Sequence, residues 1–440
     1  MRDCDLLVAH GLLVDAQGGV REDAALAVLG NRLIGVGPSA ELAARYRAAR
    51  TLDASDKLIL PGLINAHTHA SATLFRGYAA DVSGQGFFDR MWRIEALLSD
   101  EDVYVGALAG CLEMIKNGVT GFANHFSHMD QVARAVEETG IRAGLSRTML
   151  DRGDSRAAER ELEEGVRFAE RWAGRCSRID PMLGPHAAYT CSDELLRGAA
   201  EQARRSGLIL HIHVAESPHE RELISRRTGT TTVQHLERIG FFDGNRVLGA
   251  HALLLDDEDL RVLAGSDFHA AVCTTGKMNR GQGIADLPRL LDAGINVCLG
   301  TDGSASDNLD VLMGMKVTYI AQNHLHQRVQ VLPPEAILEM ATANAARALG
   351  WEMGKLAPGE LADFILVDTR KPEMRPLITR PRSNVVFNLV YYATGADVDA
   401  VIIDGKVVME DREVRTVDED RVLNDLQEHA QRLWQRAEEP

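Results

Sequence analysis

Metal-binding side chains stand at the ends of apolar segments in this sequence. His67 and His69 follow the run LILPGLINA, and His211 and His213 fall within the run GLILHIHVA. Side chains two positions apart on a β-strand point to the same side, so each His-X-His pair can direct both imidazoles at one point. Neutral imidazole is a preferred ligand of zinc and similar ions. The two pairs therefore indicate a metal site.

Other polar residues also follow apolar runs. Glu216 comes three residues after His213, His251 ends the run RVLGAH, and Asp302 follows INVCLGT. Any one of these residues has an ordinary structural alternative, such as capping a helix or hydrogen-bonding a loop. Together they place metal-compatible groups after four separate apolar runs, which favours one shared site with imidazole and carboxylate ligands.

The elements that must position these residues alternate between apolar runs and amphipathic stretches such as DEDVYVGALAGCLEMIKNG. Such alternation predicts a parallel sheet covered by helices. A TIM barrel takes roughly 250 residues and carries its active site at the carboxyl ends of its strands. We therefore expect an α/β fold in which a (β/α)8 barrel spans residues 58–355.

Short strand patterns at both ends of the chain predict a second, smaller domain. Alternating apolar residues recur in 1–57 and again in 356–417, where Asp404-Gly405 between two apolar runs is a strong hairpin signal. We expect the two ends to complete one composite β-sandwich. Residues 418–440 have helical spacing and are expected to form a terminal helix packed on the outside.

Charge and composition exclude several classes of partner. The chain has 48 Lys and Arg against 64 Asp and Glu, a net charge of -16, which disfavours binding to nucleic acid or to anionic membranes. No apolar run approaches the roughly 18 residues of a membrane span, and the first residues lack a secretory signal pattern. We therefore expect a cytoplasmic protein. The six cysteines lack Cys-X-X-Cys spacing and are expected to be free thiols.

The segments PGLINAHTHA, GPHAAYTCSDELL, HIHVAES, GAHALLL and LGTDGSASDN resemble the signature blocks of the amidohydrolase superfamily. Within it they are similar to S-adenosylhomocysteine and methylthioadenosine deaminases and to triazine hydrolases. The resemblance implies one divalent metal ion, zinc with iron as the alternative, held by four ligands: His67, His69, His213 and Asp302. His211 is then a structural residue or a neighbour of the ligands.

The resemblance also implies roles in catalysis for Glu216, His251 and Asp302. A metal ion with an open position lowers the pKa of bound water to about 7, which supplies hydroxide at neutral pH. Asp302 would accept the water proton, and His251 would orient the hydroxide. Glu216 would protonate a ring nitrogen of the substrate, a task for a carboxyl with a raised pKa.

Three further residues match substrate contacts of the family. The resemblance implies that Glu95 binds ribose hydroxyls, that Arg147 holds an anionic tail, and that His186 contacts the base. Each has a structural alternative: a surface charge for Glu95, a salt bridge at the barrel mouth for Arg147, and loop packing for His186.

Two segments depart from the family pattern. Residues 270–286 contain AVCTTGKMNRGQGIAD in place of an HNPxSN-like segment, and ANHFSH replaces a segment in which relatives often show an acidic residue. The first segment carries candidate specificity residues, namely Thr274, Lys277, Asn279 and Arg280. The alternative places Lys277 and Arg280 on a solvated loop. The second segment, ANHFSH, contains the polar residues Asn124, His125 and His128.

We therefore expect a metal-dependent hydrolase of carbon–nitrogen bonds that deaminates an aminated heterocycle: an adenosine derivative, purine, pterin, pyrimidine or triazine. The partners expected are this small molecule and water, and a homo-oligomer is left open. One alternative is hydrolytic removal of halide or alkylamine from a triazine-like ring. Another is a non-catalytic metal-binding homologue, which the presence of Glu216, His251 and Asp302 disfavours.

Overall fold

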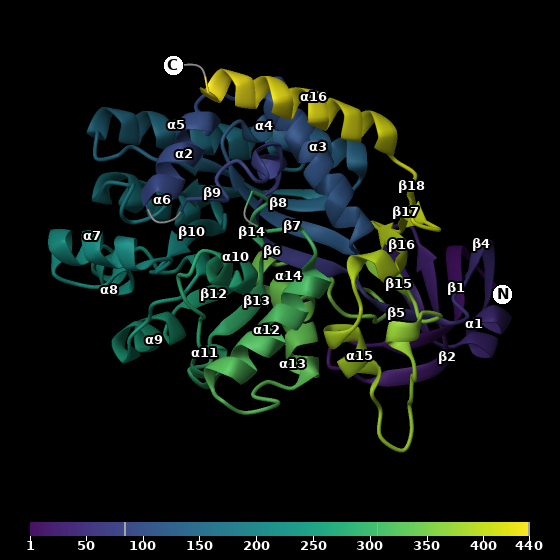
Figure 1. Cartoon of the computed structure of the whole chain (residues 1–440). Coiled ribbons are helices and arrows are strands. Elements are labelled where there is room, and N and C mark those ends of the chain that lie inside the picture. Colours follow the sequence, from purple (N-terminus) through teal and green to yellow (C-terminus); the bar gives the residue numbers. More distant parts are fainter. Residues whose placement is uncertain (83–84, 306, 439–440) are drawn as a thin grey trace.

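The chain is described by a computed structural model that covers residues 1–82, 85–305 and 307–438. A parallel sheet forms its centre (Figure 1). Its strands, in the order in which neighbours pair, are β6 (Leu63–His69), β7 (Val119–Phe126), β8 (Arg142–Met149), β9 (Ile179–Pro185), β10 (Leu210–Val214), β11 (Arg246–His251), β12 (Asp267–Val272) and β13 (Asn296–Leu299).

The sheet closes on itself through the segment that follows β13. After Gly300 and Thr301 the chain forms β14 (Asp302–Gly303), which pairs in parallel with β6. The amide of Gly300 donates to β12, and that of Thr301 donates to the carbonyl of His67. A Cβ on Gly300 would lie 2.9 Å from the backbone nitrogen and oxygen of His67, so only glycine allows this approach. The predicted barrel is confirmed, with its eighth strand divided between β13 and β14.

Helices cover the outside of the barrel (Figure 1). Every residue of β7 is buried, as expected for a strand with a packed core on one face and helices on the other. The helices that follow the barrel strands are α3 (Asp100–Lys116), α4 (Met129–Thr139), α5 (Ser155–Trp172), α6 (Asp193–Ser206), α7 (Pro218–Thr228), α8 (Thr232–Arg238), α9 (Asp257–Ala264), α10 (Thr274–Asn279), α11 (Leu287–Asp292), α12 (Val311–Leu325), α13 (Pro334–Met340) and α14 (Ala343–Leu349). Among the described helices, none combines the length and apolar composition needed to cross a bilayer.

A second sheet combines strands from both ends of the chain, which confirms the expectation that the ends share one sheet. The N-terminal part supplies β1 (Arg2–Val14), β2 (Val20–Leu29), β3 (Arg32–Pro38), β4 (Tyr46–Asp53) and β5 (Lys57–Pro61); the C-terminal part supplies β15 (Phe364–Asp368), β16 (Val398–Ile403), β17 (Lys406–Glu410) and β18 (Glu413–Val414). Antiparallel pairing of β5 with β15 joins the two parts. The turn between β16 and β17 is Asp404-Gly405, both with positive φ, so the predicted hairpin is present.

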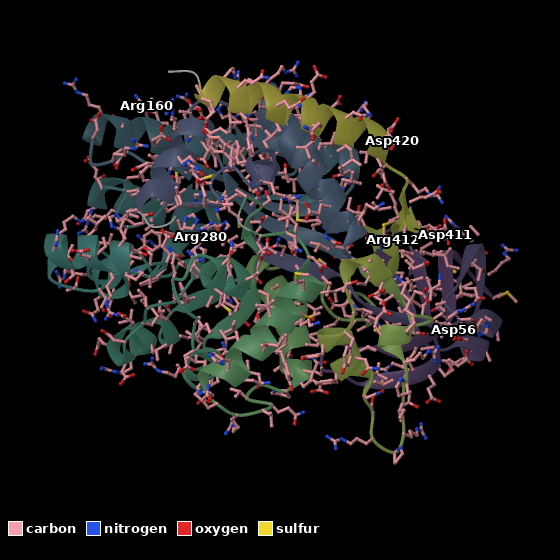
Figure 2. All side chains as sticks on the ribbon, viewed as in Figure 1. Asp56, Arg160, Arg280, Asp411, Arg412 and Asp420 are labelled. Atoms are coloured by element: carbon pink, nitrogen blue, oxygen red, sulfur yellow. The ribbon has the colours of Figure 1, made fainter. Side chains whose placement is uncertain are left out.

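The remaining helices are α1 (Ser39–Arg45), α2 (Gln85–Glu95), α15 (Val385–Tyr391) and α16 (Glu419–Glu438). Helix α16 lies along α3 (Figure 1), where His429 and Arg436 both contact the carboxylate of Asp102. In Figure 2 the side chains of Arg160 and Asp420 lie at the edge of the molecule, whereas Arg280 is labelled over the barrel. An ion pair also joins the barrel to the second sheet, because buried Arg142 on β8 pairs with Asp363, which directly precedes β15.

Candidate active site

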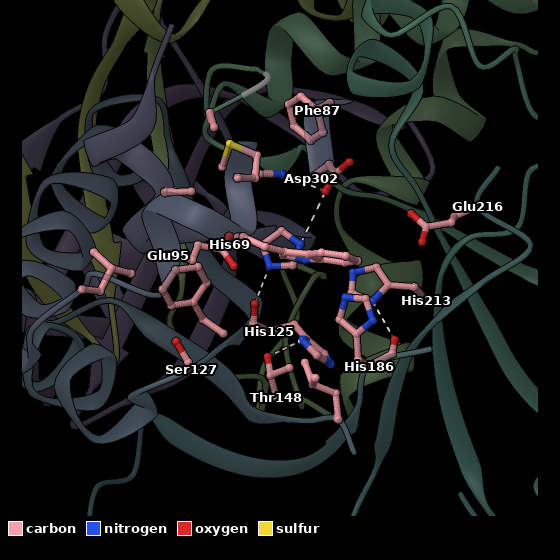
Figure 3. Close-up of a pocket in the computed structure, with 18 of the residues that line it drawn as sticks. His69, Phe87, Glu95, His125, Ser127, Thr148, His186, His213, Glu216 and Asp302 are labelled. Carbon is pink, nitrogen blue, oxygen red and sulfur yellow. Dashed lines mark hydrogen bonds and ion pairs between the residues drawn. The ribbon is translucent and has the colours of Figure 1, made fainter. Parts of the chain in front are cut away.

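The carboxyl ends of four barrel strands bring the predicted site side chains together, and Figure 3 shows His69, His213 and Asp302 among them. The ring centroid of His67 lies 4.9 Å from those of both His69 and His213, and 5.3 Å from that of His251. Oδ1 of Asp302 lies 3.5 Å from Nε2 of His69 and 3.8 Å from Nε2 of His67. Residues up to 235 positions apart thus meet as four imidazoles and a carboxylate.

Two of the histidines have their tautomers set by backbone carbonyls. Nδ1 of His69 donates to the carbonyl of His125, and Nδ1 of His213 donates to the carbonyl of His186 over 2.7 Å. A carbonyl can only accept, so the ring proton of each histidine resides on Nδ1. In the neutral form of each ring, Nε2 then presents a lone pair to the centre of the cluster.

The tautomer of His67 follows from a buried chain of side chains. The hydroxyl of Ser146 donates its one hydrogen to the carbonyl of Asn124 over 2.8 Å, so it accepts from Nδ1 of His211 over 2.9 Å. Nε2 of His211 is then an acceptor, and Nδ1 of His67 donates to it over 2.8 Å. His67 is left with an unprotonated Nε2. His211 is therefore a hydrogen-bonding neighbour of a predicted ligand.

The donor set fits a divalent metal ion. Nε2 of His67 and Oδ2 of Asp302 are buried and have no hydrogen-bond partner in the described parts of the chain. Such orphaned polar atoms are costly unless an ion or a water satisfies them. The His67, His69 and Asp302 side chains have ligand atoms within 4.8 Å of one another, and His213 joins His67 in a second group. Burial and the neighbouring imidazoles hold the pKa of His67 well below its usual range, which keeps its lone pair available.

The backbone is strained where it presents these groups. His251 has a φ of 82°, Asp302 a φ of 66°, and Ala215, which precedes Glu216, a φ of 52°. Non-glycine residues in this left-handed region cost about 1–3 kcal/mol each and persist where the surrounding structure enforces them. The strain occurs at three strand ends that all contribute to the same cluster.

The carboxylate of Glu216 is held at both oxygens. Tyr189 donates its hydroxyl to Oε1 over 2.8 Å, and the ammonium of Lys277 donates to Oε2 over 3.3 Å. Nε2 of His251 lies 3.7 Å from the same Oε2. Burial acts to raise the pKa of Glu216, but the charge of Lys277 and the nearby histidines lowers it further than burial raises it. The expectation of a raised pKa for this carboxyl is therefore wrong, because Lys277 and Tyr189 stabilise its ionised form.

The departing segment 270–286 brings Lys277 and Arg280 into the site, whereas Asn279 is exposed. Only 3% of the Lys277 side chain is exposed, and its Nζ lies 4.0 Å from Oδ2 of Asp302. The guanidinium of Arg280 lies 3.5 Å from the same oxygen and stacks over the ring of Phe87 at 4.1 Å. The alternative of a solvated loop is therefore wrong for both cations. Thr274 is also buried, where its hydroxyl bonds to Thr318.

A cavity of about 400 Å³ opens beside the metal-binding cluster. Its wall includes Glu95 and His186, so the structure places both at the site. Burial raises the pKa of Glu95 to about 7 and, together with nearby imidazoles, lowers the pKa of His186 to about 3. His125 also lines the cavity; its buried Nε2 has no hydrogen-bond partner among the described residues, while its Nδ1 bonds to Thr148.

Arg147 does not reach this cavity. Ser146 and Thr148, its neighbours on β8, point into the barrel towards His211 and His125. Alternation along a strand turns Arg147 to the opposite face, where it pairs with Glu161 on α5 over 3.0 Å. The arginines among the described lining residues are Arg152 and Arg280. The structure thus matches the salt-bridge alternative for Arg147.

Tyr189, Ser146 and Thr148 are residues of the site that were not predicted from the sequence. Each carries a hydroxyl that forms a hydrogen bond with a glutamate or histidine of the site. Tyr189 lies in the segment between β9 and α6, where no local spacing indicates its contact with Glu216. For Ser146 and Thr148 a weak signal exists, because polar side chains at alternate positions of a buried strand point to one face of the sheet.

The chain is similar to known proteins in both sequence and fold. Residues 58–408 match the model of the Amidohydrolase family. A 5′-deoxyadenosine deaminase of Methanosarcina acetivorans is 39% identical over 440 residues, which is 99% of this chain and 100% of that protein. A 5-methylthioadenosine/S-adenosylhomocysteine deaminase of Pelotomaculum thermopropionicum is 41% identical over 97% of both chains. An adenosine deaminase of Xanthomonas campestris, solved with bound zinc, superposes with a TM-score of 0.93 at 26% identity and covers 99% of both chains.

Proposed function

Because this chain belongs to the amidohydrolase family, we propose that it is a metal-dependent deaminase that hydrolyses the exocyclic amino group of an adenosine derivative. The observation that carries the proposal is the cluster of His67, His69, His213 and Asp302, of which His69, His213 and Asp302 line one cavity together with Glu216. The two curated relatives act on 5′-modified adenosines and cover almost the whole chain.

His67, His69, His213 and Asp302 would hold the ion, and zinc is our choice of metal because the Xanthomonas structure holds it. Bound there, the ion would lower the pKa of a water molecule and make it a nucleophile at neutral pH. Asp302 lies beside this position and accepts a proton from the water. His251 is buried next to Glu216 and orients the water against the ring carbon.

Glu216 moves the proton that activates the ring. Its carboxylate is ionised before the substrate binds, so it must first collect the proton that it gives to a ring nitrogen. The attacking water supplies that proton, and Glu216 acts as a shuttle rather than as an acid that is already protonated. Ammonia leaves when the amino nitrogen receives the second proton of the water, the one that Asp302 accepted.

Glu95, His186 and His125 bind the substrate in this proposal. A cavity of about 400 Å³ falls within the usual range for a small-molecule ligand. Glu95 reaches the cavity from α2 and suits hydroxyl donors such as those of ribose. Glu95→Gln is therefore expected to raise the KM for nucleosides by about 10-fold, the factor that corresponds to the free energy of one hydrogen bond to a charged group. The KM for free adenine, which has no ribose, should stay unchanged.

The test is ammonia release from a panel of compounds by protein loaded with one equivalent of zinc. The panel contains 5′-deoxyadenosine, 5′-methylthioadenosine, S-adenosylhomocysteine, adenosine, adenine, a pterin and an aminotriazine, and a chlorotriazine tests for halide release. We expect the 5′-modified adenosines to have the highest kcat/KM. Turnover of a triazine alone, or of no compound by zinc-loaded protein, would overturn the proposal. Asp302→Asn provides the inactive control.

A further inference from the structure

Lys277 is a buried cation that the proposed chemistry does not use. Its side chain is 3% exposed and enters the site from α10, in the segment that departs from the family pattern. Burying an ammonium is expensive unless it is paired and hydrogen-bonded. Lys277 has two anionic neighbours, because its Nζ lies 3.3 Å from Oε2 of Glu216 and 4.0 Å from Oδ2 of Asp302.

Lys277 contacts one oxygen of the Glu216 carboxylate, and Tyr189 contacts the other. Tyr189 donates to Oε1, so the two carboxylate oxygens have separate donors. A glutamate side chain has three rotatable bonds, and one donor leaves the carboxylate plane free to turn. Two donors at different oxygens fix that plane. The preceding backbone is fixed as well, because the amide of Glu216 donates to the carboxylate of Glu220 over 2.6 Å.

We propose that Lys277 is a positioning residue that, together with Tyr189, holds the Glu216 carboxylate in the orientation required for proton transfer and keeps it at a set spacing from Asp302. The inference rests on the proposed function, which assigns the proton transfer to Glu216. It predicts that Lys277 acts on kcat through Glu216, with little effect on KM, because Lys277 is not among the described residues that line the cavity.

The test compares Lys277→Met in two backgrounds. Methionine is close to lysine in length and has no charge or donor. In the otherwise unchanged protein, we expect Lys277→Met to lower kcat for 5′-methylthioadenosine by about 10- to 100-fold, the cost of a misplaced reacting group. In a Glu216→Gln background we expect little further loss, since the carboxylate that Lys277 positions is already absent. An equal fold-loss in both backgrounds would overturn the inference.

Two controls separate positioning from folding. Lys57→Met removes a partly buried lysine that pairs with Asp399 in the second sheet, and it is expected to leave kcat unchanged. Zinc content and melting temperature are measured for each variant. Where Lys277→Met does not fold, Tyr189→Phe serves in its place. It removes only a hydroxyl and is expected to lower kcat and to lose its effect in the Glu216→Gln background.

The outcomes also separate this inference from the proposed function. A kcat unchanged by Glu216→Gln would overturn the assigned role of Glu216, and with it the proposed mechanism. A kcat strongly lowered by Glu216→Gln but unchanged by Lys277→Met would overturn the inference alone. A rise in KM without a change in kcat in Lys277→Met would indicate contact with the substrate and would also overturn it.

Discussion

Removal of the Ser146 hydroxyl should weaken metal binding although Ser146 is not itself a predicted ligand. Ser146 accepts the proton of His211 Nδ1, and this sets the tautomer in which His67 offers an unprotonated Nε2. In Ser146→Ala, His211 can carry its proton on Nε2 instead, which forces the proton of His67 towards the metal position. The penalty is about one neutral hydrogen bond, about 0.5–1.5 kcal/mol, so the Kd for zinc should rise by about 2- to 13-fold.

The assay is competition for Zn²⁺ against a chromophoric chelator, repeated with Co²⁺, whose visible spectrum reports the ligand geometry directly. Thr148→Val is the matched control. Thr148 stands two residues further along the same strand, and its hydroxyl also bonds to a buried histidine, His125. The side chain of His125 makes no hydrogen bond to His67, His69 or His213 within the described chain. Thr148→Val should therefore leave the metal Kd unchanged.

The reasoning would be refuted by a zinc Kd in Ser146→Ala equal to that of the unchanged protein, with an unchanged Co²⁺ spectrum. It would also fail if Thr148→Val weakened metal binding by the same factor, since that result would indicate general loosening of β8. A lowered melting temperature without a change in Kd would assign Ser146 to packing.

Two further predictions rest on single contacts, and a third concerns removal of the metal. Gly300→Ala should prevent the close approach to the His67 backbone and lower both zinc stoichiometry and melting temperature; normal values of both would contradict the packing argument. Asp102→Asn should cost about 1–2 kcal/mol of unfolding free energy in denaturant titrations. Burial raises the pKa of Asp102, but hydrogen bonds from Ser99 and His429 lower it below its ordinary value, so this stabilisation is present above a pH of about 4 and should be lost as the pH falls further. Chelation of the metal should lower the melting temperature, and added zinc should restore it.

The barrel could be predicted because its elements repeat a local pattern. Apolar runs separated by amphipathic stretches indicate parallel strands whatever their exact partners. The closure of the barrel could not be predicted in the same way. It depends on the two-residue strand Asp302–Gly303 pairing with β6, a contact across more than 230 positions that has no periodicity of its own. The multiple pairings of β1, with β2, β4 and β5, are equally non-local.

In the site, too, features set by local spacing could be predicted, whereas features that depend on residues from other elements could not. His67 and His69 were predicted because two-residue spacing on one strand determines their common direction. The ionisation of Glu216 was predicted wrongly, because its sign depends on Lys277 and Tyr189, which arrive from other elements. Burial alone raises the pKa of a carboxyl, and the sequence provides only an estimate of burial. The charge of a neighbour 61 positions away reverses the outcome.

Strand register decides which residues of β8 serve the site. Ser146 and Thr148 face inward and set the hydrogen bonding of two histidines, whereas Arg147 between them pairs with Glu161 outside. A shift of one residue would exchange these roles completely, since the side-chain period of a strand is two. A match of Arg147 to a family residue therefore cannot establish contact with substrate unless the register is known. An anionic substituent on the substrate would instead meet Arg152 or Arg280, which do line the cavity, and the effect of replacing each on the KM for S-adenosylhomocysteine relative to 5′-deoxyadenosine would distinguish them.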